Sequence, residues 1–408
     1  MHFYVHIPFC RKKCNYCAFY SVIYKKGVES AFLSAILNEI DLMSNVLEYF
    51  PFQFNNGHLH KNNTLYIGGG TPSLMKPSYI NKIKNRIKKR FHILKFDEFT
   101  IEVNPESITA NKLNQYEKIG VSRISVGIQS LNDMDLKILG RIHNSHQAME
   151  SLNLILSSAI PEISVDLLYG LPNSEIEQII QCLKKVIAVG IKHISLYMLT
   201  PEPNTILESE ILAGKVNIPS ADNSSRQYYL AMSFLEEFGY IPYEVSNFAM
   251  DGHRCIHNIG YWKYEPYLSF GPSAHSFNGI HRWANASSIQ QYIDYFASIN
   301  NTELSEIIHQ ETDEQNYPNL LAKLNLPLDF IETLTAEQKI SEIVMLGLRT
   351  EEGVELNRTD KYADRILQSV ESLIDKNIVR FDGERIWIPS TKRLLADGIA
   401  KQIFQGMK

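Results

Sequence analysis

The chain has 408 residues, of which 44% are hydrophobic and 21% are charged, and its formal net charge is -5. This length is enough for one large domain and a smaller one, and the composition is ordinary for a globular protein. The negative charge balance gives no electrostatic reason to expect nucleic acid as a partner. Because no apolar run approaches the roughly 18 to 20 residues of a membrane span and the start lacks a signal-peptide pattern, we expect a soluble, cytoplasmic protein.

Short β-branched segments alternate with amphipathic stretches through the first part of the chain. The expected strands are 3–7, 64–68, 99–103, 123–128, 163–169, 193–199 and 241–245, and the expected helices include 29–48, 78–92, 133–140, 174–189 and 224–238. Repetition of strand, crossover helix and strand requires a parallel sheet. An α/β barrel, complete or partial, or an open wound sheet fits this pattern.

Polar residues gather where the expected strands end. They are the cysteine-containing loop after the first strand, GGGTPS at 68–73, Glu102 and Asn104, Gln129, and Asp166. In barrels of alternating strands and helices, the loops at the carboxyl ends of the strands build the active site. The distribution therefore favours a barrel with a site at one rim.

The last hundred residues follow a different pattern. We expect a helix from Gln338 to Gly353, a second helix over 360–376, and a hairpin about Asp382-Gly383. This order is similar to a small winged-helix module, and its mixed charge favours a packing or interaction role over DNA binding. The predicted domains are a barrel at 1–245, a connecting segment at 246–305 and a C-terminal domain at 306–408.

The basic run at 82–90 is interpreted as a solvated helix face. Its predicted buried stripe consists of Ile80, Ile83, Ile87 and Phe91, which recur at helical spacing. Charges opposite such a stripe face water. The run therefore gives no argument for a nucleic-acid partner.

Three of the five cysteines, Cys10, Cys14 and Cys17, lie close together in HIPFCRKKCNYC. Thiolates select zinc or iron-sulfur clusters. A structural zinc site would need a fourth ligand, which His6 could supply. A four-iron cluster held by three cysteines instead leaves one iron open for a substrate or cofactor. The cysteines alone leave both alternatives open.

The spacing C-x3-C-x2-C, with Tyr16 between the last two cysteines and GGGTP after the second strand, resembles the radical SAM superfamily. This resemblance implies a partial (β/α)6 barrel, here with a C-terminal winged-helix-like domain. It also implies a 4Fe-4S cluster on the three cysteines, with S-adenosylmethionine (SAM) bound at the open iron. The glycines of GGGTP would let the backbone approach the methionine moiety.

The resemblance narrows to one branch through YVHIPFC, YIGGGTPS, TIEVNPE, RISVGIQS, LGRIH, VDLLYGLP and ISLYMLTPEPNT. They are similar to the branch that contains oxygen-independent coproporphyrinogen III oxidase and the HemW heme chaperones. The SAM contacts that this branch implies are Tyr4, Tyr16, Gly69, Gly70, Thr71, Glu102, Gln129, Arg141 and Asp166. Glu102 suits the methionine ammonium, Arg141 a carboxylate and Asp166 ribose hydroxyls.

Two features separate the members of this branch. The oxidase pattern has a fourth cysteine at the position of Phe19, whereas the chaperones have phenylalanine there, as this chain does. The chain departs from the chaperone pattern at Ala18, where chaperones usually carry an acidic residue. The second feature is the HNxxYW motif, here His257, Asn258, Tyr261 and Trp262, which is associated with heme in the chaperones.

Heme is thus the expected cargo, and Cys255 and His275 are alternatives to His257 as its iron ligand. We predict a heme chaperone, with the oxidase and another radical SAM reaction as alternatives. The heme acceptor and electron donor are not specified by the sequence, and membrane association through a partner stays open.

Overall fold

The computed structural model describes residues 1–49, 62–299, 304, 306–308 and 317–407. They form two compact units, and each is built from several chain segments. The first unit contains Met1–Ile163, Thr200–Lys215 and Glu265–Thr333, and the second contains Ser164–Leu199, Val216–Tyr264 and Leu334–Lys408. The sequence-based domain boundaries at 245 and 305 stay predictions.

The first unit is built on a sheet whose central strands are parallel. In spatial order these strands are β1 (His2–Ile7), β4 (Thr64–Gly69), β5 (Glu98–Val103) and β6 (Arg123–Gln129). All four were predicted, because each is a short segment rich in β-branched and aromatic residues, and most of their residues are buried. Their carboxyl ends therefore meet at one edge of the sheet.

The sequence did not predict the extension of this sheet beyond β1. Here β11 (Tyr267–Phe270) pairs with β1 in parallel, and an antiparallel series follows in the order β12 (His275–Phe277), β13 (His281–Asn285) and β14 (Leu328–Thr333). These strands are mostly short and carry polar residues, so their sequences give weak signals.

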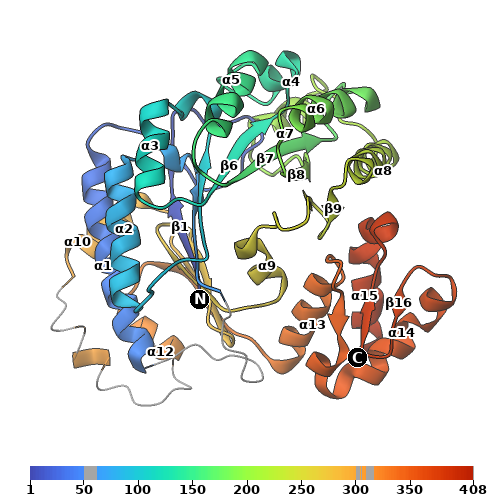
Figure 1. Ribbon diagram of the computed structural model, residues 1–408. Coiled ribbons are helices and arrows are strands. Elements are labelled where there is room, and N and C mark those ends of the chain that lie inside the picture. Colours follow the sequence, from blue (N-terminus) through green and yellow to red (C-terminus); the bar gives the residue numbers. More distant parts are fainter. Residues whose placement is uncertain (50–61, 300–303, 305, 309–316, 408) are drawn as a thin grey trace. The chain divides into compact units, whose positions relative to one another are not determined.

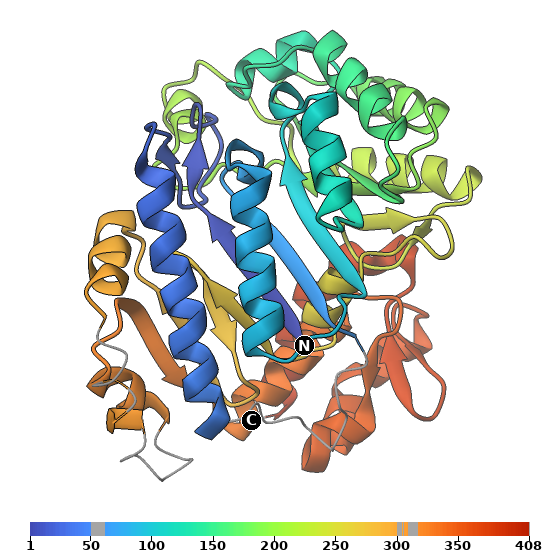
Figure 2. The ribbon, with the colours of Figure 1, turned by 60° about the vertical axis from the view of Figure 1, so that its left-hand side comes forward.

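Helices cover this sheet, and α1 and α2 run side by side along it (Figures 1 and 2). Among the described residues, the helices of the first unit include α1 (Val28–Tyr49), α2 (Pro77–Arg90), α3 (Ala110–Lys118), α4 (Asp133–Ile138), α5 (Ser145–Leu156), α7 (Ile206–Leu212), α10 (Ile289–Ala297) and α12 (Tyr317–Lys323). Short 3-10 turns, η2 (Pro72–Leu74) and η3 (Pro105–Ser107), follow β4 and β5 closely.

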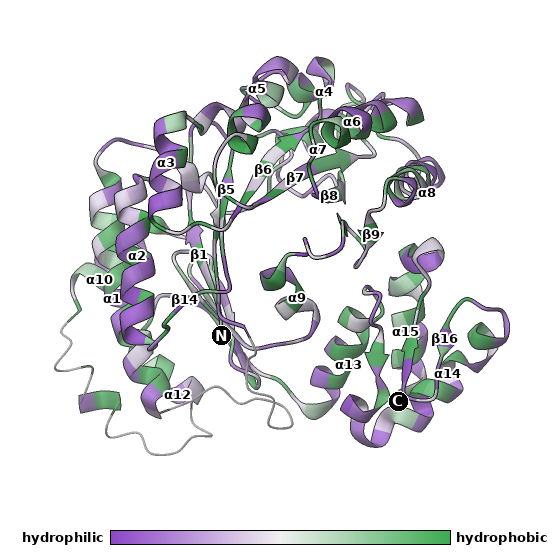
Figure 3. Ribbon diagram, in the orientation of Figure 1, coloured by the Kyte–Doolittle hydropathy of each residue, from purple (hydrophilic) through white to green (hydrophobic). Residues whose placement is uncertain are grey.

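The basic helix α2 has the predicted one-sided burial. Ile80, Ile83 and Ile87 are fully buried, whereas the predicted fourth member, Phe91, follows the helix and is only half-buried. The rest of α2 is largely hydrophilic (Figure 3). The predicted buried stripe is therefore confirmed apart from Phe91, but the basic residues are only partly solvated. Arg86 and Arg90 pair with Asp41 on α1, and Lys84 donates to Ile119 O at 2.7 Å.

In the second unit, β7 (Glu162–Tyr169) and β8 (His193–Met198) pair in parallel. The helix between them is α6 (Ile176–Ala188), and α8 (Ala221–Glu237) follows β8 in the same unit. The predicted parallel strand at 241–245 is wrong. The strand β9 covers only Ile241–Pro242, and it pairs antiparallel with β10 (Asn247–Ala249), which itself pairs antiparallel with β8. Glu244 forms a separate antiparallel bridge to Thr350. Pro242 lacks a backbone donor, which suits a short edge strand.

The remainder of the second unit contains α9 (Ile256–Trp262) and the C-terminal elements. These elements are α13 (Ala336–Gly347), β15 (Val354–Glu355), η5 (Leu356–Tyr362), α14 (Ala363–Asp375), β16 (Arg380–Phe381), β17 (Arg385–Trp387), η6 (Ser390–Leu395) and α15 (Ala396–Met407). The hairpin about Asp382-Gly383 is confirmed, because β16 and β17 pair antiparallel across it.

Both predicted C-terminal helices are shorter than expected. The first begins earlier, after its N-cap Thr335, and ends at Gly347 instead of Gly353. The second begins at Ala363 because Asp360 adopts a non-helical conformation with φ 47°. Within the described residues, no helix is both long and apolar enough to cross a membrane.

Candidate functional site

The cysteine-containing loop leaves the sheet after β1 and is fixed at two points within the first unit. Its ends are joined where β2 (Phe9–Cys10) pairs with β3 (Val22–Ile23). In its middle, Asn15 donates from its backbone N to Leu139 O at 3.0 Å and from Nδ2 to Ile138 O at 2.9 Å. The carbonyl of Asn15 also accepts a hydrogen bond from Leu207 N at 2.8 Å. The loop is thus anchored to the segment after α4 and to α7.

The three thiols of this loop are half-buried and lie within electrostatic reach of one another. Burial raises the pKa of the Cys10 and Cys17 thiols, and for Cys10 a hydrogen bond from Thr71 partly offsets this. In the part of the chain that the structure describes, no three His, Cys, Asp or Glu side chains are gathered closely enough to hold one metal ion. A four-iron cluster has a different requirement, since each thiolate binds its own iron.

His6, the fourth ligand of the alternative zinc site, is engaged elsewhere. Its Nε2 lies 2.9 Å from Tyr20 O and its Nδ1 lies 3.1 Å from Tyr4 Oη. Because a carbonyl only accepts, Nε2 carries the proton and Nδ1 accepts from the tyrosine. Burial lowers the pKa of this imidazole to about 4. Both ring nitrogens are therefore occupied, which favours the cluster over zinc.

The glycine segment after β4 contacts this loop through its backbone. A Cβ on Gly69, whose φ is 115°, would lie 2.8 Å from the His6 ring, and a Cβ on Gly70 would lie 2.9 Å from Cys10 Sγ. Gly70 N donates to Ile7 O at 2.8 Å and Thr71 N donates to Phe9 O at 2.7 Å. Glycine is required at both positions, because Gly69 has a positive φ and lies against the His6 ring, and Gly70 lies against Phe9 O and Cys10 Sγ.

Glu102, on the neighbouring strand β5, is oriented by two donors. Tyr66 Oη donates to Glu102 Oε1 at 2.9 Å, and Gly69 N donates to Glu102 Oε2 at 3.0 Å. The ring of Tyr66 stacks with that of Tyr4 at a centroid distance of 6.1 Å. A fixed carboxylate at a strand end suits an ammonium group.

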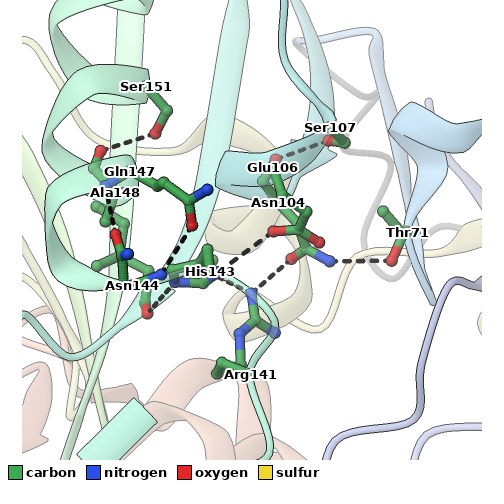
Figure 4. A network of polar contacts seen from close by, with 12 residues as sticks. Thr71, Asn104, Glu106, Ser107, Arg141, His143, Asn144, Gln147, Ala148 and Ser151 are labelled. Atoms are coloured by element: carbon green, nitrogen blue, oxygen red, sulfur yellow. Dashed lines mark hydrogen bonds and ion pairs between the residues drawn. The ribbon is translucent and has the colours of Figure 1, made fainter. Parts of the chain in front are cut away.

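Arg141 lies beside the second cysteine. Its Nη1 donates to Cys14 Sγ at 3.4 Å, and its Nη2 donates to Gly127 O at 2.6 Å. The same Nη2 donates to Asn104 Oδ1 at 2.8 Å, a bond drawn in Figure 4. Burial lowers the pKa of this guanidinium, but nearby Tyr16 and Cys14 outweigh burial and raise it overall. Its buried Nε has no hydrogen-bond partner among the described residues. This donor suits a bound anion such as a carboxylate.

Gln129 ends β6 in a left-handed conformation with φ 72°. A Cβ on Gly127 would lie 3.1 Å from Gln129 Nε2 and 3.3 Å from Asn104 Oδ1. The side chains of Gln129, Asn104 and Arg141 therefore converge on the backbone of Gly127. A side chain there would separate them.

Eight of the nine predicted SAM residues thus belong to the first unit. The exception is Asp166, which lies on β7 in the second unit, where it interacts electrostatically with Tyr197. Sequence reasoning did not assign Tyr66, which orients Glu102, or give Asn104 a role. The position of Asn104 at a strand end was the only available signal.

The predicted heme-associated residues lie on α9. His257 is only 1% exposed, and its Nε2 lies 2.9 Å from Tyr261 Oη. Cys255 precedes the helix as its N-cap residue and is also buried. His275, the third candidate ligand, is exposed and lies on β12 in the first unit. Of the three candidate iron ligands, only His275 is therefore exposed.

A cavity of about 370 Å³ lies within the second unit beside α9. Trp262 lines it, whereas His257 does not. Its other lining residues include Tyr243, Arg254, Ile259, Tyr264, Ile343, Arg358 and Arg385. Several of its cations are already paired, as Arg254 is with Glu351 and Lys263 with Glu352 at 3.1 Å. Aromatic and aliphatic walls with charged groups suit a flat, amphipathic ligand.

Comparisons with known proteins agree with this geometry. The family model described as "Radical SAM superfamily" matches residues 4–186. A protein named heme chaperone HemW from Bacillus subtilis is 28% identical over 97% of both chains. The protein of that name from Buchnera aphidicola of Acyrthosiphon pisum is 36% identical, covering 67% of this chain and 69% of its own.

One solved structure covers almost the whole chain. The coproporphyrinogen III oxidase HemN from Escherichia coli, described as a radical SAM enzyme, has a TM-score of 0.72. It shares 20% sequence identity and covers 98% of this chain and 89% of its own. This similarity shows the fold, and it confirms the predicted α/β class.

The fold, the cysteine loop and the matched family model define a radical SAM protein. Since two thirds of a named relative is covered at more than 30% identity, the chain belongs more narrowly to the HemW family.

Proposed function

We propose that this protein is a cytoplasmic heme chaperone, which binds heme and passes it to an acceptor protein. The observation that carries the proposal is the similarity over 97% of the chain to a relative named heme chaperone HemW. The complete HNxxYW segment, from His257 to Trp262, supports it.

In this proposal Cys10, Cys14 and Cys17 ligate three irons of a 4Fe-4S cluster. When bound, this cluster supplies an electron and an open iron at which SAM can bind and exchange. The residues present fit both groups. Arg141 offers its buried, unpartnered Nε to the methionine carboxylate, and Glu102 offers its oriented carboxylate to the ammonium.

Further contacts follow from the same placement. Gly69, Gly70 and Thr71 present backbone at the cysteine loop without Cβ obstruction at the glycines. Tyr4, Tyr16 and Gln129 complete the set in the first unit, and Asp166 is assigned to the ribose hydroxyls. Each of these side chains binds or orients SAM in the proposal.

For heme, the proposal uses α9 and the cavity beside it. Trp262 offers an aromatic face on which a porphyrin can stack. Arg358 in the cavity wall suits a propionate group, whereas Arg385 is already paired with Asp382 at 2.9 Å. Because His257 does not line this cavity, a heme bound there uses another iron ligand or requires α9 to move.

The second candidate is oxygen-independent coproporphyrinogen III oxidase, which the fold alone favours. Phe19 counts against it, because this side chain stands where the oxidase pattern has a cysteine. The Phe19 side chain is 71% exposed and so is not explained by packing. A different radical SAM reaction is the third candidate, and the complete HNxxYW motif counts against it.

Heme transfer tests the proposal. The protein with its cluster rebuilt anaerobically is loaded with one equivalent of heme and mixed with apomyoglobin, and the absorbance of holomyoglobin is followed. We expect transfer, and we expect Trp262→Ala to weaken heme binding roughly tenfold through the lost stacking. Phe238→Ala, which removes a 47% exposed ring from the same unit, is the matched control. Absence of heme binding by the unmodified protein would exclude the chaperone.

A further inference from the structure

We propose that Asn104 is a positioning residue for the cysteine loop, because its side-chain amide joins the two groups that donate hydrogen bonds to Cys10 and Cys14. The inference rests on the proposed role of these cysteines as cluster ligands. Asn104 follows β5 at the start of η3 but makes no side-chain capping bond there. Its amide is therefore not needed by the helix that it precedes.

The side chain of Asn104 forms hydrogen bonds with Arg141 and with Thr71, and the chemistry of these partners fixes the direction of both bonds (Figure 4). Arg141 Nη2 lies 2.8 Å from Asn104 Oδ1. Since a guanidinium has only donors, the amide oxygen must face Arg141, and the amide nitrogen must face the other way. Asn104 Nδ2 then donates to Thr71 Oγ1 at 3.0 Å.

Each end of this arrangement reaches a cysteine. Because Thr71 Oγ1 accepts from Asn104, its own proton is directed toward Cys10 Sγ, 3.7 Å away. At the other end, Arg141 Nη1 donates to Cys14 Sγ at 3.4 Å. One amide thus holds a hydroxyl on the first thiol and a guanidinium on the second.

Donors of this kind affect a metal centre without touching the metal. Hydrogen bonds to cysteine sulfurs stabilise their negative charge and raise the reduction potential of an iron-sulfur cluster. Asn104 acts only through Thr71 and Arg141, so its loss should loosen both donors together. The local turn does not depend on this side chain, because Ser107 N and Oγ bond to the backbone carbonyl of Asn104 at 2.9 and 2.6 Å.

The test compares Asn104→Ala with Asn38→Ala in the full chain after anaerobic cluster rebuilding. Asn38 is a matched control because its amide instead bonds to Phe296 O, at 2.7 Å. The readouts are iron per chain, the midpoint potential of the cluster and the rate of cluster loss to a chelator. We expect Asn104→Ala to take up iron, to show a more negative potential and to lose its cluster roughly tenfold faster. Asn38→Ala should match the unmodified protein.

Two further variants test the coupling. In Asn104→Asp, the carboxylate still accepts from Arg141 but also accepts the Thr71 proton, which draws that proton away from Cys10. The midpoint potential should again be more negative than that of the unmodified protein, although the substituted side chain has nearly the same volume. Combining Asn104→Ala with Thr71→Val should shift the midpoint potential by less than the sum of the two single shifts. Both substitutions act on the same hydrogen bond, from Thr71 Oγ1 to Cys10 Sγ.

Unchanged potential and chelation rate in Asn104→Ala, or additive shifts in the double variant, would overturn the inference. If Asn104→Ala does not fold, an unchanged potential in Asn104→Asp overturns it equally. Failure of the proposed cluster ligation gives a different result, since the unmodified chain would then take up no 4Fe-4S cluster, whereas absence of heme binding would exclude the chaperone and leave this test unaffected.

Discussion

Replacing Gly70 with alanine tests how closely the glycine segment approaches the cysteine loop. The added Cβ would lie 2.8 Å from Phe9 O and 2.9 Å from Cys10 Sγ, distances that must lengthen. The carbonyl cannot withdraw freely, because Thr71 N donates to it at 2.7 Å. Overpacking of this kind costs about 1–3 kcal/mol. The strain falls on Cys10 itself, so the loop should be displaced before the sheet is.

The assay measures iron per chain after anaerobic cluster rebuilding, together with the thermal unfolding midpoint of the apo-protein. Gly70→Ala should hold much less iron and unfold a few degrees lower. Gly398→Ala is the control, because its Cβ meets nothing within 4 Å and it lies inside α15, where alanine adds about 0.5–1 kcal/mol. Its iron content should be unchanged. Full iron content and an unchanged midpoint in Gly70→Ala would refute the close approach.

Three further outcomes are expected. Cys14→Ser should abolish the cluster absorbance while the circular dichroism of the apo-protein stays unchanged; recovery of a zinc-only protein would contradict the radical SAM assignment. Burial raises the pKa of Glu39 to about 7 from 4.5, so the folded state keeps its proton longer than the unfolded state. Stability from Glu39 is complete below pH 4.5 and is lost as the pH rises to 7, by up to about 3 kcal/mol. In urea unfolding between pH 5 and 8, the free energy of unfolding of Glu39→Gln should lack this pH-dependent decrease. An equal decrease in both proteins would show that Glu39 is not its cause. Finally, Arg123→Met should cost about 3–5 kcal/mol in urea unfolding because it leaves the buried Glu98, 3.0 Å from Arg123 Nε, without this partner. Restoring stability with Glu98→Leu in the same chain is the matching control, and a cost below 1 kcal/mol would show that the pair is unimportant.

The central parallel strands were predictable because their sequences are locally decisive. In β6, for example, the β-branched residues Ile124, Val126 and Ile128 indicate a strand, and every residue except the last is buried. The strands from β11 to β14 were missed because they are mostly short and partly polar. At 241–245, β-branched and aromatic residues indicated a strand, but the neighbouring position on β8 is taken by β10.

In the candidate site too, some features could be predicted from local sequence and others could not. Its cysteines, glycines and carboxylate could be named from local motifs, which place them at strand ends. The Asn104 network could not, because Thr71, Asn104 and Arg141 are far apart in the sequence and meet only across β4, β5 and the segment after α4. Nor could the sequence show that His257 is buried against Tyr261 while Trp262 lines the cavity.

One measurement tests the central claim, that this chain carries heme and does not make a porphyrin. A single anaerobic preparation with its cluster rebuilt is divided between a heme titration and a coproporphyrinogen III decarboxylation assay with SAM and a reductant. The chaperone account predicts saturable binding of heme and no decarboxylated product. Sustained decarboxylation without heme binding would contradict it.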